Sequence, residues 1–246
     1  MNQILVTKKL YVTPELKKKK RLYKLDFIIS LFLILILVSL YIYAEYDRTK
    51  SEQVSQQILD DFNSQEELTK RQTQSDVLVV VLNGAQEDEN IVELNSKANE
   101  VPKKLEYTTP NGYKYYTIAT ISIPKINVNY PIIQGETETE EEIDELLKHA
   151  PCRLAGPDPN EVGNFCIIGH NYRNSKFFSK VPNLQNGDQI NITDLNENTV
   201  TYEVYRKYIV DPTDLSCLDS SNKKEITLIT CTDDSKQRVI VKAKAI

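Results

Sequence analysis

Residues 225–245 read EITLITCTDDSKQRVIVKAKA, which are two β-rich runs joined by a polar turn. The first run ends at Cys231 and the second begins at Arg238. The Asp-Asp-Ser sequence at 233–235 has the composition of a tight turn. A hairpin of this length brings the end of one strand beside the start of the next. Cys231 and Arg238 are therefore expected to be neighbours.

The region upstream of this hairpin has the same β-rich texture. Apolar and polar residues alternate in YYTIATISI (115–123), which predicts a strand ending before Pro124. Thr139 and Glu142 have the spacing of a capping box for one short helix. Further strands are expected at 126–133, 164–169, 189–193, 199–210, 225–231 and 238–243. Many short strands with one brief helix indicate an all-β fold, a closed or nearly closed barrel, rather than a parallel α/β sheet.

The N-terminal part of the chain has a different composition. Basic residues crowd residues 8–24, and residues 27–44 (FIISLFLILILVSLYIYA) contain no charge, proline or glycine. A helix of that length can cross the roughly 30 Å hydrocarbon layer of a bilayer. A cleaved signal peptide is the alternative, but this run exceeds a usual signal core, and 42–44 is a poor cleavage site. The positive-inside rule then predicts a single-pass protein of the cell membrane, with a cytoplasmic N-terminus and an extracellular C-terminal domain.

The segment after the apolar run is polar and is interpreted as a stalk. Four apolar residues in it recur at helical spacing, so part of the stalk is expected to be helical: Val54, Ile58, Leu59 and Phe62. The apolar run 77–82 fits a strand or a docked segment, and 83–104 has the composition of a linker. The predicted organisation is a cytoplasmic basic segment (1–26), a transmembrane helix (27–44), an extracellular stalk (45–106) and a folded domain (107–246).

Charge and cysteine content narrow the function classes. The 246 residues carry a formal net charge of -5, whereas a nucleic-acid binder normally shows a basic face, so no nucleic-acid partner is expected. Four cysteines in an exported region ordinarily suggest two disulfides: Cys152, Cys166, Cys217 and Cys231. A catalytic Cys231 requires a free thiol. Cys166 is expected in the core. Cys217 keeps three interpretations: an inert small residue, a disulfide partner of Cys152, or an oxidation-sensitive thiol.

A cysteine nucleophile also needs a group that can hand a proton to the leaving amine, most often histidine. The chain has two histidines. His170 follows the strand 164–169 at a strand-to-loop exit, where functional side chains are commonly displayed. His149 falls in the last turn of the short helix, and a solvated helix-end role is sufficient for it. We therefore expect Cys231 as nucleophile, His170 as proton-transfer partner and Arg238 as the stabiliser of developing charge, each as a candidate. By residue type alone, a strand cysteine is more often a core residue than a catalyst, so a core role for Cys231 stays open at this point.

The residues around these positions resemble the sortase family. Leu228-Ile229-Thr230-Cys231 is similar to the Leu-x-Thr-Cys signature that closes a sortase strand, with Arg238 on the next strand. Gly169-His170-Asn171 resembles the family's Gly-His segment, and Ile123-Pro124-Lys125-Ile126 resembles its barrel-entry strand. The resemblance covers residues 115–246. Its motifs look closer to the housekeeping or spore-former classes, class D- or B-like, than to pilin polymerases.

This resemblance implies a closed barrel of about eight strands with one or two short helices, preceded by the transmembrane helix and stalk. It implies a thiol-dependent transpeptidase, endopeptidase-like in its first step, that cleaves a C-terminal Leu-Pro-x-Thr-Gly-like sorting signal through a thioacyl intermediate. The implied partners are surface proteins bearing that signal and a peptidoglycan-precursor amine of a Gram-positive cell wall. Thr230, Val210 and Pro212 are expected to contact the substrate.

No cofactor or metal is required by such chemistry. Some sortases use calcium, and the acidic run 138–145 is the place where this chain could bind it, although a solvated helix face explains the run better. Other interpretations stay open: a cysteine peptidase that uses water, a pilin-polymerising sortase, or a non-enzymatic tethered binding domain with paired cysteines. Chain order argues against a papain-like protease, because His170 precedes Cys231.

Overall fold

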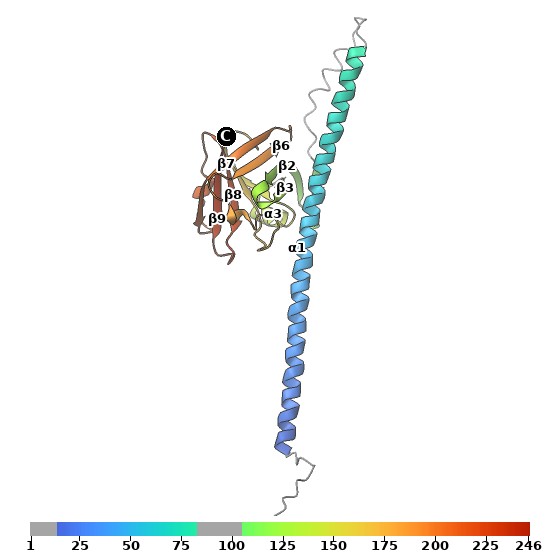
Figure 1. Ribbon diagram of the computed structural model, residues 1–246, viewed down its shortest axis with the longest axis vertical. Coiled ribbons are helices and arrows are strands. Elements are labelled where there is room, and N and C mark those ends of the chain that lie inside the picture. Colours follow the sequence, from blue (N-terminus) through green and yellow to red (C-terminus); the bar gives the residue numbers. More distant parts are fainter. Residues whose placement is uncertain (1–13, 83–104) are drawn as a thin grey trace, which may run out of the picture. The chain divides into compact units, whose positions relative to one another are not determined.

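Strand pairing closes the C-terminal region into a β-barrel (Figure 1). The computed structural model describes residues 14–82 and 105–246. Within these residues the strands are hydrogen-bonded in the order β1-β2-β3-β4-β5-β8-β9-β7-β6, and β2 also pairs with β6. That last pairing joins the two ends, so β2 to β9 form a closed eight-stranded barrel, with β1 added beside β2. The predicted all-β barrel is confirmed.

The elements agree with the sequence pattern wherever a strand is long. Seven of the strands lie close to predicted runs, whereas β1 and β4 are short and were not predicted. The strands are β1 (Glu106–Thr108), β2 (Lys114–Ile123), β3 (Val128–Gly135), β4 (Cys152–Ala155), β5 (Gly163–Ile168), β6 (Gln189–Asp194), β7 (Thr199–Val210), β8 (Lys224–Cys231) and β9 (Arg238–Ala245). The helices are α1 (Pro14–Leu82), α3 (Glu140–Leu146) and the 3-10 turns η1 (Pro124–Ile126), η2 (Val181–Asn183) and η3 (Ser216–Leu218).

Helix α1 is continuous from the basic segment through the apolar run and into the predicted stalk. It contains the one stretch in the described residues that is long and apolar enough to cross a membrane. The helical periodicity predicted around residues 54–62 is confirmed, and 77–82 is helical rather than a strand. The predicted linker at 83–104 lies outside the described residues, as does the start of the basic segment at 1–13.

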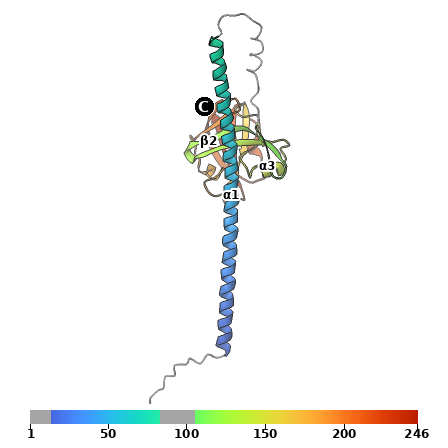
Figure 2. The same ribbon diagram turned by 90° about the vertical axis from the view of Figure 1, so that its right-hand side faces the viewer.

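Part of α1 belongs to the same compact unit as the barrel. The chain divides into two units, 1–49 and 50–246. Ile58 and Leu59 are buried, so the stalk residues predicted to be apolar contact a core rather than solvent. The cluster that includes Ile58 and the partly buried Val54 also contains Tyr115, Ile133, Leu146, Leu147, Ala150 and Cys152. Figure 2 shows the barrel strands and α3 from a second side.

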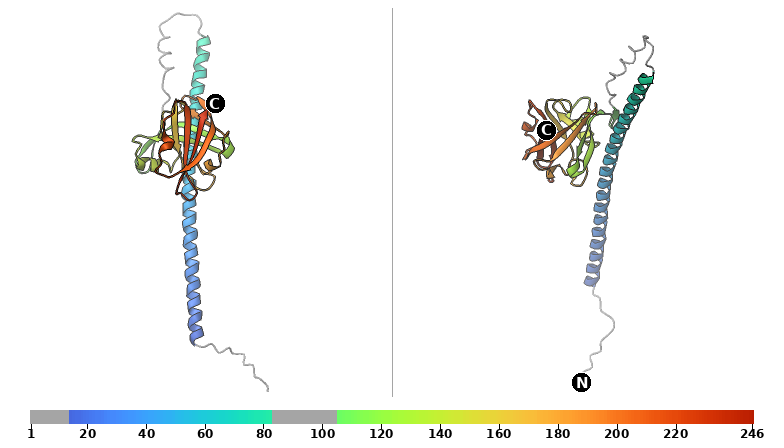
Figure 3. Two further views of the ribbon diagram at one scale, coloured as in Figure 1. Left: turned by 90° about the vertical axis from the view of Figure 1, so that its left-hand side faces the viewer. Right: turned by 45° about the horizontal axis from the view of Figure 1, so that its top comes forward.

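The main core fills the barrel interior. It is formed by inward-facing residues of the strands, among them Ile121, Ile192 and Leu228, all fully buried. Their alternation with more exposed neighbours is the pattern expected of a strand with one face on a core. Strands β8, β9 and β7 are neighbours in that order and lie side by side in the barrel wall (Figure 3). These strands carry four of the predicted site residues: Val210, Thr230, Cys231 and Arg238.

The short helix α3 begins at the N-cap residue that the sequence predicts. Thr139 Oγ1 accepts a hydrogen bond of 3.3 Å from the Glu142 N–H, which is one half of the predicted capping box. The Glu142 side chain is 2% exposed and turns back onto the loop before Thr139. Its carboxylate accepts from the backbone N–H groups of Glu136, Thr137 and Glu138 at 3.0, 3.0 and 2.6 Å. The acidic run is therefore not simply a solvated face at this position.

Glu142→Gln is expected to lower the stability of the domain. A neutral amide keeps one acceptor oxygen but cannot satisfy all the buried N–H donors, which costs about 2 kcal/mol. For a domain of this size the midpoint of thermal unfolding should fall by roughly 4–8 °C. Near-ultraviolet circular dichroism of the full chain in detergent measures this midpoint. Glu141→Gln, at an exposed position of the same helix turn, is the matched control and should shift it by less than about 2 °C. Equal shifts for the two variants would contradict the assignment.

Candidate active site

Cys231 and Arg238 face each other across the hairpin. They are paired residues of the antiparallel β8–β9 ladder, and Arg238 is in turn paired with Val210 of β7. Both Cys231 and Arg238 are half-buried, so each keeps part of its side chain accessible. The sequence prediction that the hairpin makes these two residues neighbours is confirmed. One row across three strands thus contains a free thiol, a guanidinium and an apolar side chain.

His170 reaches the same end of the barrel through a parallel strand pair. Strand β5 pairs with β8 in a register that matches Ile168 with Ile229, and Gly169 N–H donates to Ile229 O at 3.0 Å. Continuing that register by two residues brings His170 level with Cys231. The three predicted catalytic residues therefore come from three neighbouring strand ends.

Two side chains hold the segment around His170 against β8. Thr230 Oγ1 donates a 2.8 Å hydrogen bond to Gly169 O, and Asn171 Nδ2 donates a 2.9 Å bond to Cys231 O. Gly169 leaves no room for a side chain, because a Cβ there would overlap the Phe178 ring. These contacts fix the backbone on both sides of His170 relative to Cys231.

Of the three residues expected to contact substrate, Thr230 has a different environment from the one predicted. Its side chain is 1% exposed and faces inward, so its role in this structure is to hold Gly169. Val210 is half-buried against the cluster that contains Ile229, and Pro212 is exposed in the connection after β7. Val210 and Pro212 thus remain next to the Arg238 end of the sheet, where a peptide could reach them.

The imidazole of His170 lies in a partly desolvated environment. Burial lowers the pKa of His170, the charge of Lys148 acts in the same direction, and Asp144 opposes them. The ring lies against Tyr172, with 5.1 Å between the ring centroids and a tilt of 43°. A lowered pKa makes the protonated imidazole a stronger acid, which suits the transfer of a proton to a departing amine.

The sequence suggested a solvated His149, but in the structure its ring is packed against another side chain. Its ring stacks on Tyr115, with 5.8 Å between centroids, and within the described residues neither ring nitrogen has a hydrogen-bond partner. Burial lowers the pKa of His149. The helix-end position predicted a solvated cation, but the neighbouring Tyr115 of β2 covers the ring. This environment fits a packing role and leaves His170 as the histidine next to the thiol.

The four cysteines are free thiols, and three of them are buried. Cys166 and Cys217 share one cluster, whereas Cys152 lies in the cluster beneath α1, so the Cys152–Cys217 disulfide is not formed in this structure. Burial raises the pKa of Cys166 to about 12 and also raises that of Cys217. The pKa of the fully buried Cys152 is raised as well. Cys231 is the accessible thiol among the four.

Two contacts that no sequence pattern indicated, made by Asn171 and Arg173, tie the loop after His170 to the β8–β9 turn. Asn171 Nδ2 also donates to Asp233 Oδ1 at 3.0 Å, and Arg173 Nη2 donates to Ser235 Oγ at 2.7 Å. Asn171 was part of a recognisable motif, but its partner is 62 positions away along the chain, and no local pattern reveals such a contact.

A closed barrel with a thiol, an imidazole and a guanidinium at three adjacent strand ends has the features of a thiol-dependent active site. The model of the Sortase domain family matches residues 121–246, which is just over half of the sequence. The chain belongs to the sortase family.

Several relatives are similar to about half of this chain. It is 33% identical to Sortase A of Bacillus anthracis over 146 residues, covering 56% of this chain and 65% of that protein. It is 30% identical to Sortase A of Listeria monocytogenes, covering 53% and 58%. The chain thus spans less than two thirds of either relative. A solved structure of the Clostridium perfringens Sortase D5 transpeptidase is 31% identical, covering 65% of this chain and 90% of that one, with a TM-score of 0.46.

The two histidines should titrate separately and respond differently to nearby charge. His170 is expected to titrate below its ordinary pKa of 6.5. Asp144→Asn should lower the pKa of His170 further, because the Asp144 charge favours the His170 cation, and should affect His149 less. Lys148→Gln should raise both pKa values, because the Lys148 charge opposes both cations. Imidazole NMR of the full chain in detergent measures these shifts, with His149→Gln as the assignment control. A His170 pKa above 6.5 would contradict the environment described.

Proposed function

We propose that this protein is a membrane-anchored cysteine transpeptidase that transfers surface proteins to a cell-wall amine. The observation that supports it most is the placement of Cys231, His170 and Arg238 at three adjacent strand ends. Membership of the sortase family supports the same chemistry. The substrate is a protein with a C-terminal Leu-Pro-x-Thr-Gly-like sorting signal, cut between its Thr and Gly.

In the first half of the reaction the Cys231 thiolate attacks the carbonyl carbon of the scissile peptide bond. The new carbon–sulfur bond produces a tetrahedral oxyanion, and the Arg238 guanidinium beside Cys231 donates hydrogen bonds to it or to the peptide backbone. The carbon–nitrogen bond then breaks. His170 gives its proton to the departing amine, and a thioester on Cys231 remains.

The second half resolves the thioester with an amine. The incoming amine attacks the thioester carbonyl, His170 accepts the proton it loses, and the Cys231 thiolate departs. The product is a new peptide bond, so the energy of the original amide bond is retained through the thioester. A peptidoglycan-precursor amine is the proposed acceptor. The reaction requires no cofactor or metal, because proton transfer and charge stabilisation are supplied by side chains.

The apolar run within α1 is the proposed membrane anchor. Its length, its lack of charge and the basic residues before it support a single-pass helix with the N-terminus in the cytoplasm. In that orientation the barrel lies outside the cell, where both sorting signals and cell-wall precursors occur. Protease accessibility of the barrel on intact cells would test this orientation.

Cys231→Ala in the full chain should abolish cleavage of a fluorogenic Leu-Pro-x-Thr-Gly peptide. His170→Ala should reduce kcat by about 10²–10⁴, the range for a positioned general acid. Arg238→Ala should reduce it by about 10²–10³, as for removal of an oxyanion donor, and Arg238→Lys should retain part of the rate. Cys152→Ala is the control, since that thiol is buried elsewhere. Normal turnover by Cys231→Ala would refute the proposal.

Mass spectrometry of products with and without an amine acceptor separates the proposed activity from the alternatives. A ligated product that replaces the hydrolysed one when the amine is added supports transpeptidation. Hydrolysis alone, whatever the amine, would favour a cysteine peptidase. Preference for a lysine side chain of a protein over a peptidoglycan-precursor amine would indicate a pilin-polymerising enzyme.

Thr230→Val is expected to impair catalysis through the position of His170. The substitution keeps the shape but removes the hydroxyl that holds Gly169 O. Thr227→Val is the matched control: Thr227 is also buried on β8 and bonds Asn164, away from His170. Each variant should lose about 1–3 kcal/mol of stability. Only Thr230→Val should also lower kcat, by roughly tenfold. Equal kcat for the two folded variants would refute this role.

A further inference from the structure

The loop that follows His170 has an unusual backbone conformation. Phe177 is fully buried and has a φ of 46°, in the left-handed region that bulky residues seldom adopt. The next residue contacts His170 again: the Phe178 N–H donates a hydrogen bond of 3.0 Å to His170 O. We call residues 171–178 the histidine loop. A residue in such a conformation persists only when surrounding contacts hold it there.

Tyr130 of β3 holds Phe177, together with a backbone bridge between Phe177 and Asn171. The Phe177 N–H donates to the Tyr130 hydroxyl at 3.1 Å, and the two rings stack with 5.1 Å between centroids and 7° between planes. Because the hydroxyl oxygen accepts this bond, its own proton is available for donation. The Tyr130 hydroxyl donates this proton to Oε1 of Glu52 in α1, with 3.3 Å between the two oxygens.

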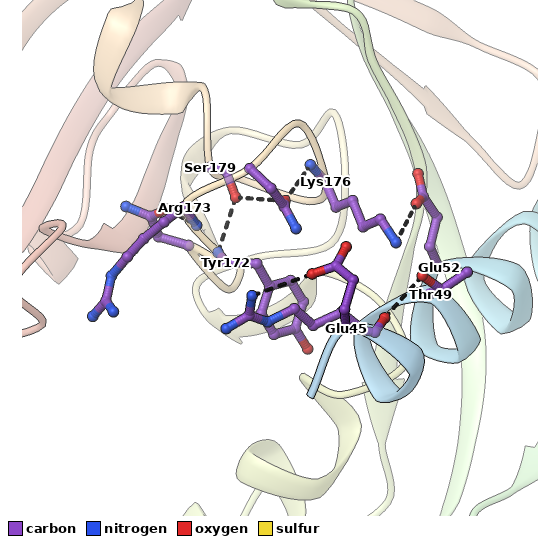
Figure 4. Close-up of polar contacts among 10 residues, drawn as sticks. Glu45, Thr49, Glu52, Tyr172, Arg173, Lys176 and Ser179 are labelled. Atoms are coloured by element: carbon purple, nitrogen blue, oxygen red, sulfur yellow. Dashed lines mark hydrogen bonds and ion pairs between the residues drawn. The ribbon is translucent and has the colours of Figure 1, made fainter. Parts of the chain in front are cut away.

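Glu52 also contacts the histidine loop directly. Its other oxygen, Oε2, lies 3.2 Å from Lys176 Nζ, and Figure 4 shows the Lys176 side chain extended towards it. The side chain of Lys176 is 13% exposed and that of Glu52 is 31% exposed, so this ion pair is shielded more than an ordinary surface pair. One carboxylate of α1 therefore contacts both the loop and the tyrosine that supports the loop.

A series of aromatic contacts continues from Phe177 to the imidazole. The Phe177 ring meets Tyr172 edge-on at 5.4 Å, and Tyr172 lies 5.1 Å from His170. The backbone of Tyr172 is also held, because its N–H donates a hydrogen bond of 2.9 Å to Ser179 Oγ (Figure 4). Packed rings transmit a displacement because the interior leaves little free volume.

We propose that Glu52 and Tyr130 are positioning residues that hold the histidine loop so that the imidazole of His170 stays level with Cys231. The inference rests on the proposed catalytic role of His170. Under this proposal, residues 50–64 of α1 contribute to catalysis by positioning the histidine loop and are not only a spacer. A change that detaches this helical segment from the barrel would then slow the reaction without touching a residue that meets substrate.

Tyr130→Phe in the full chain in detergent is the direct test, with Tyr107→Phe as its matched control. Tyr107 also carries a hydroxyl bonded to a carboxylate of α1, Asp61, at 3.3 Å, but it lies on β1. Tyr130→Phe should lower kcat by about fivefold to tenfold, the factor expected for one lost hydrogen bond at a positioned group, with little change in KM. Tyr107→Phe should change kcat by less than about twofold.

The NMR titration of His170 is a second readout that needs no activity. Loosening the histidine loop admits water to the imidazole, so Tyr130→Phe should raise the pKa of His170 towards its ordinary value. The signal of His149 serves as the internal reference. Asp144 of α3 and Lys148 just after that helix, the charged groups acting on His170, are unchanged in these variants. If the wild-type chain ligates no peptide, the proposed function fails, while this titration still decides the positioning role.

Glu52→Ala is the second variant, because alanine preserves the helix and avoids any change in the barrel core. It removes the contacts to Tyr130 and Lys176 together, so kcat should fall and the His170 pKa should rise in the same direction as in Tyr130→Phe. If Tyr130→Phe fails to fold, Glu52→Ala decides alone. The proposal is overturned if the folded variants match Tyr107→Phe in both kcat and His170 titration.

Discussion

The parallel pairing of β5 with β8 is the constraint on which the candidate active site depends. This pairing brings His170 to the level of Cys231, because the register from Gly163 to Ile168 fixes the point at which the chain leaves strand β5. The β8–β9 hairpin then adds Arg238 on the other side. A one-residue slip in either pairing would turn the side chains to the opposite face, so the chemistry is fixed by backbone hydrogen bonds before any side chain contributes.

What the sequence could predict follows from how local each feature is. The neighbours Cys231 and Arg238 were predictable because a hairpin is a short-range structure. The helical spacing of Val54 and Ile58 predicted a helix but not its contact with the barrel, since periodicity reveals an apolar face and not its partner. Likewise β4 has four residues and is defined by its pairing with β3 and β5 rather than by its own pattern.

The less predictable polar features have a common physical origin. Glu142 satisfies backbone N–H groups of a preceding loop, and Thr230 satisfies the carbonyl of Gly169. Glu142 was predicted to lie in an acidic run on a solvated helix face, and Thr230 was predicted to contact the substrate that the family resemblance implies. A buried backbone group must find a partner, and a nearby polar side chain serves when the strand ladder ends. Such contacts depend on the path of the loop, which has no sequence period.

Burial also explains how the domain can hold four thiols and leave one of them accessible. A thiolate, not a thiol, is the nucleophile, and burial in apolar surroundings disfavours the charged form. It raises the pKa of Cys152, Cys166 and Cys217, so these three remain protonated and unreactive in their clusters. Cys231 differs by its position at a strand end, where the ladder stops and the side chain is half-exposed beside a guanidinium. The accessibility of the Cys231 thiol is thus set by where strand β8 ends, while burial shields the other three.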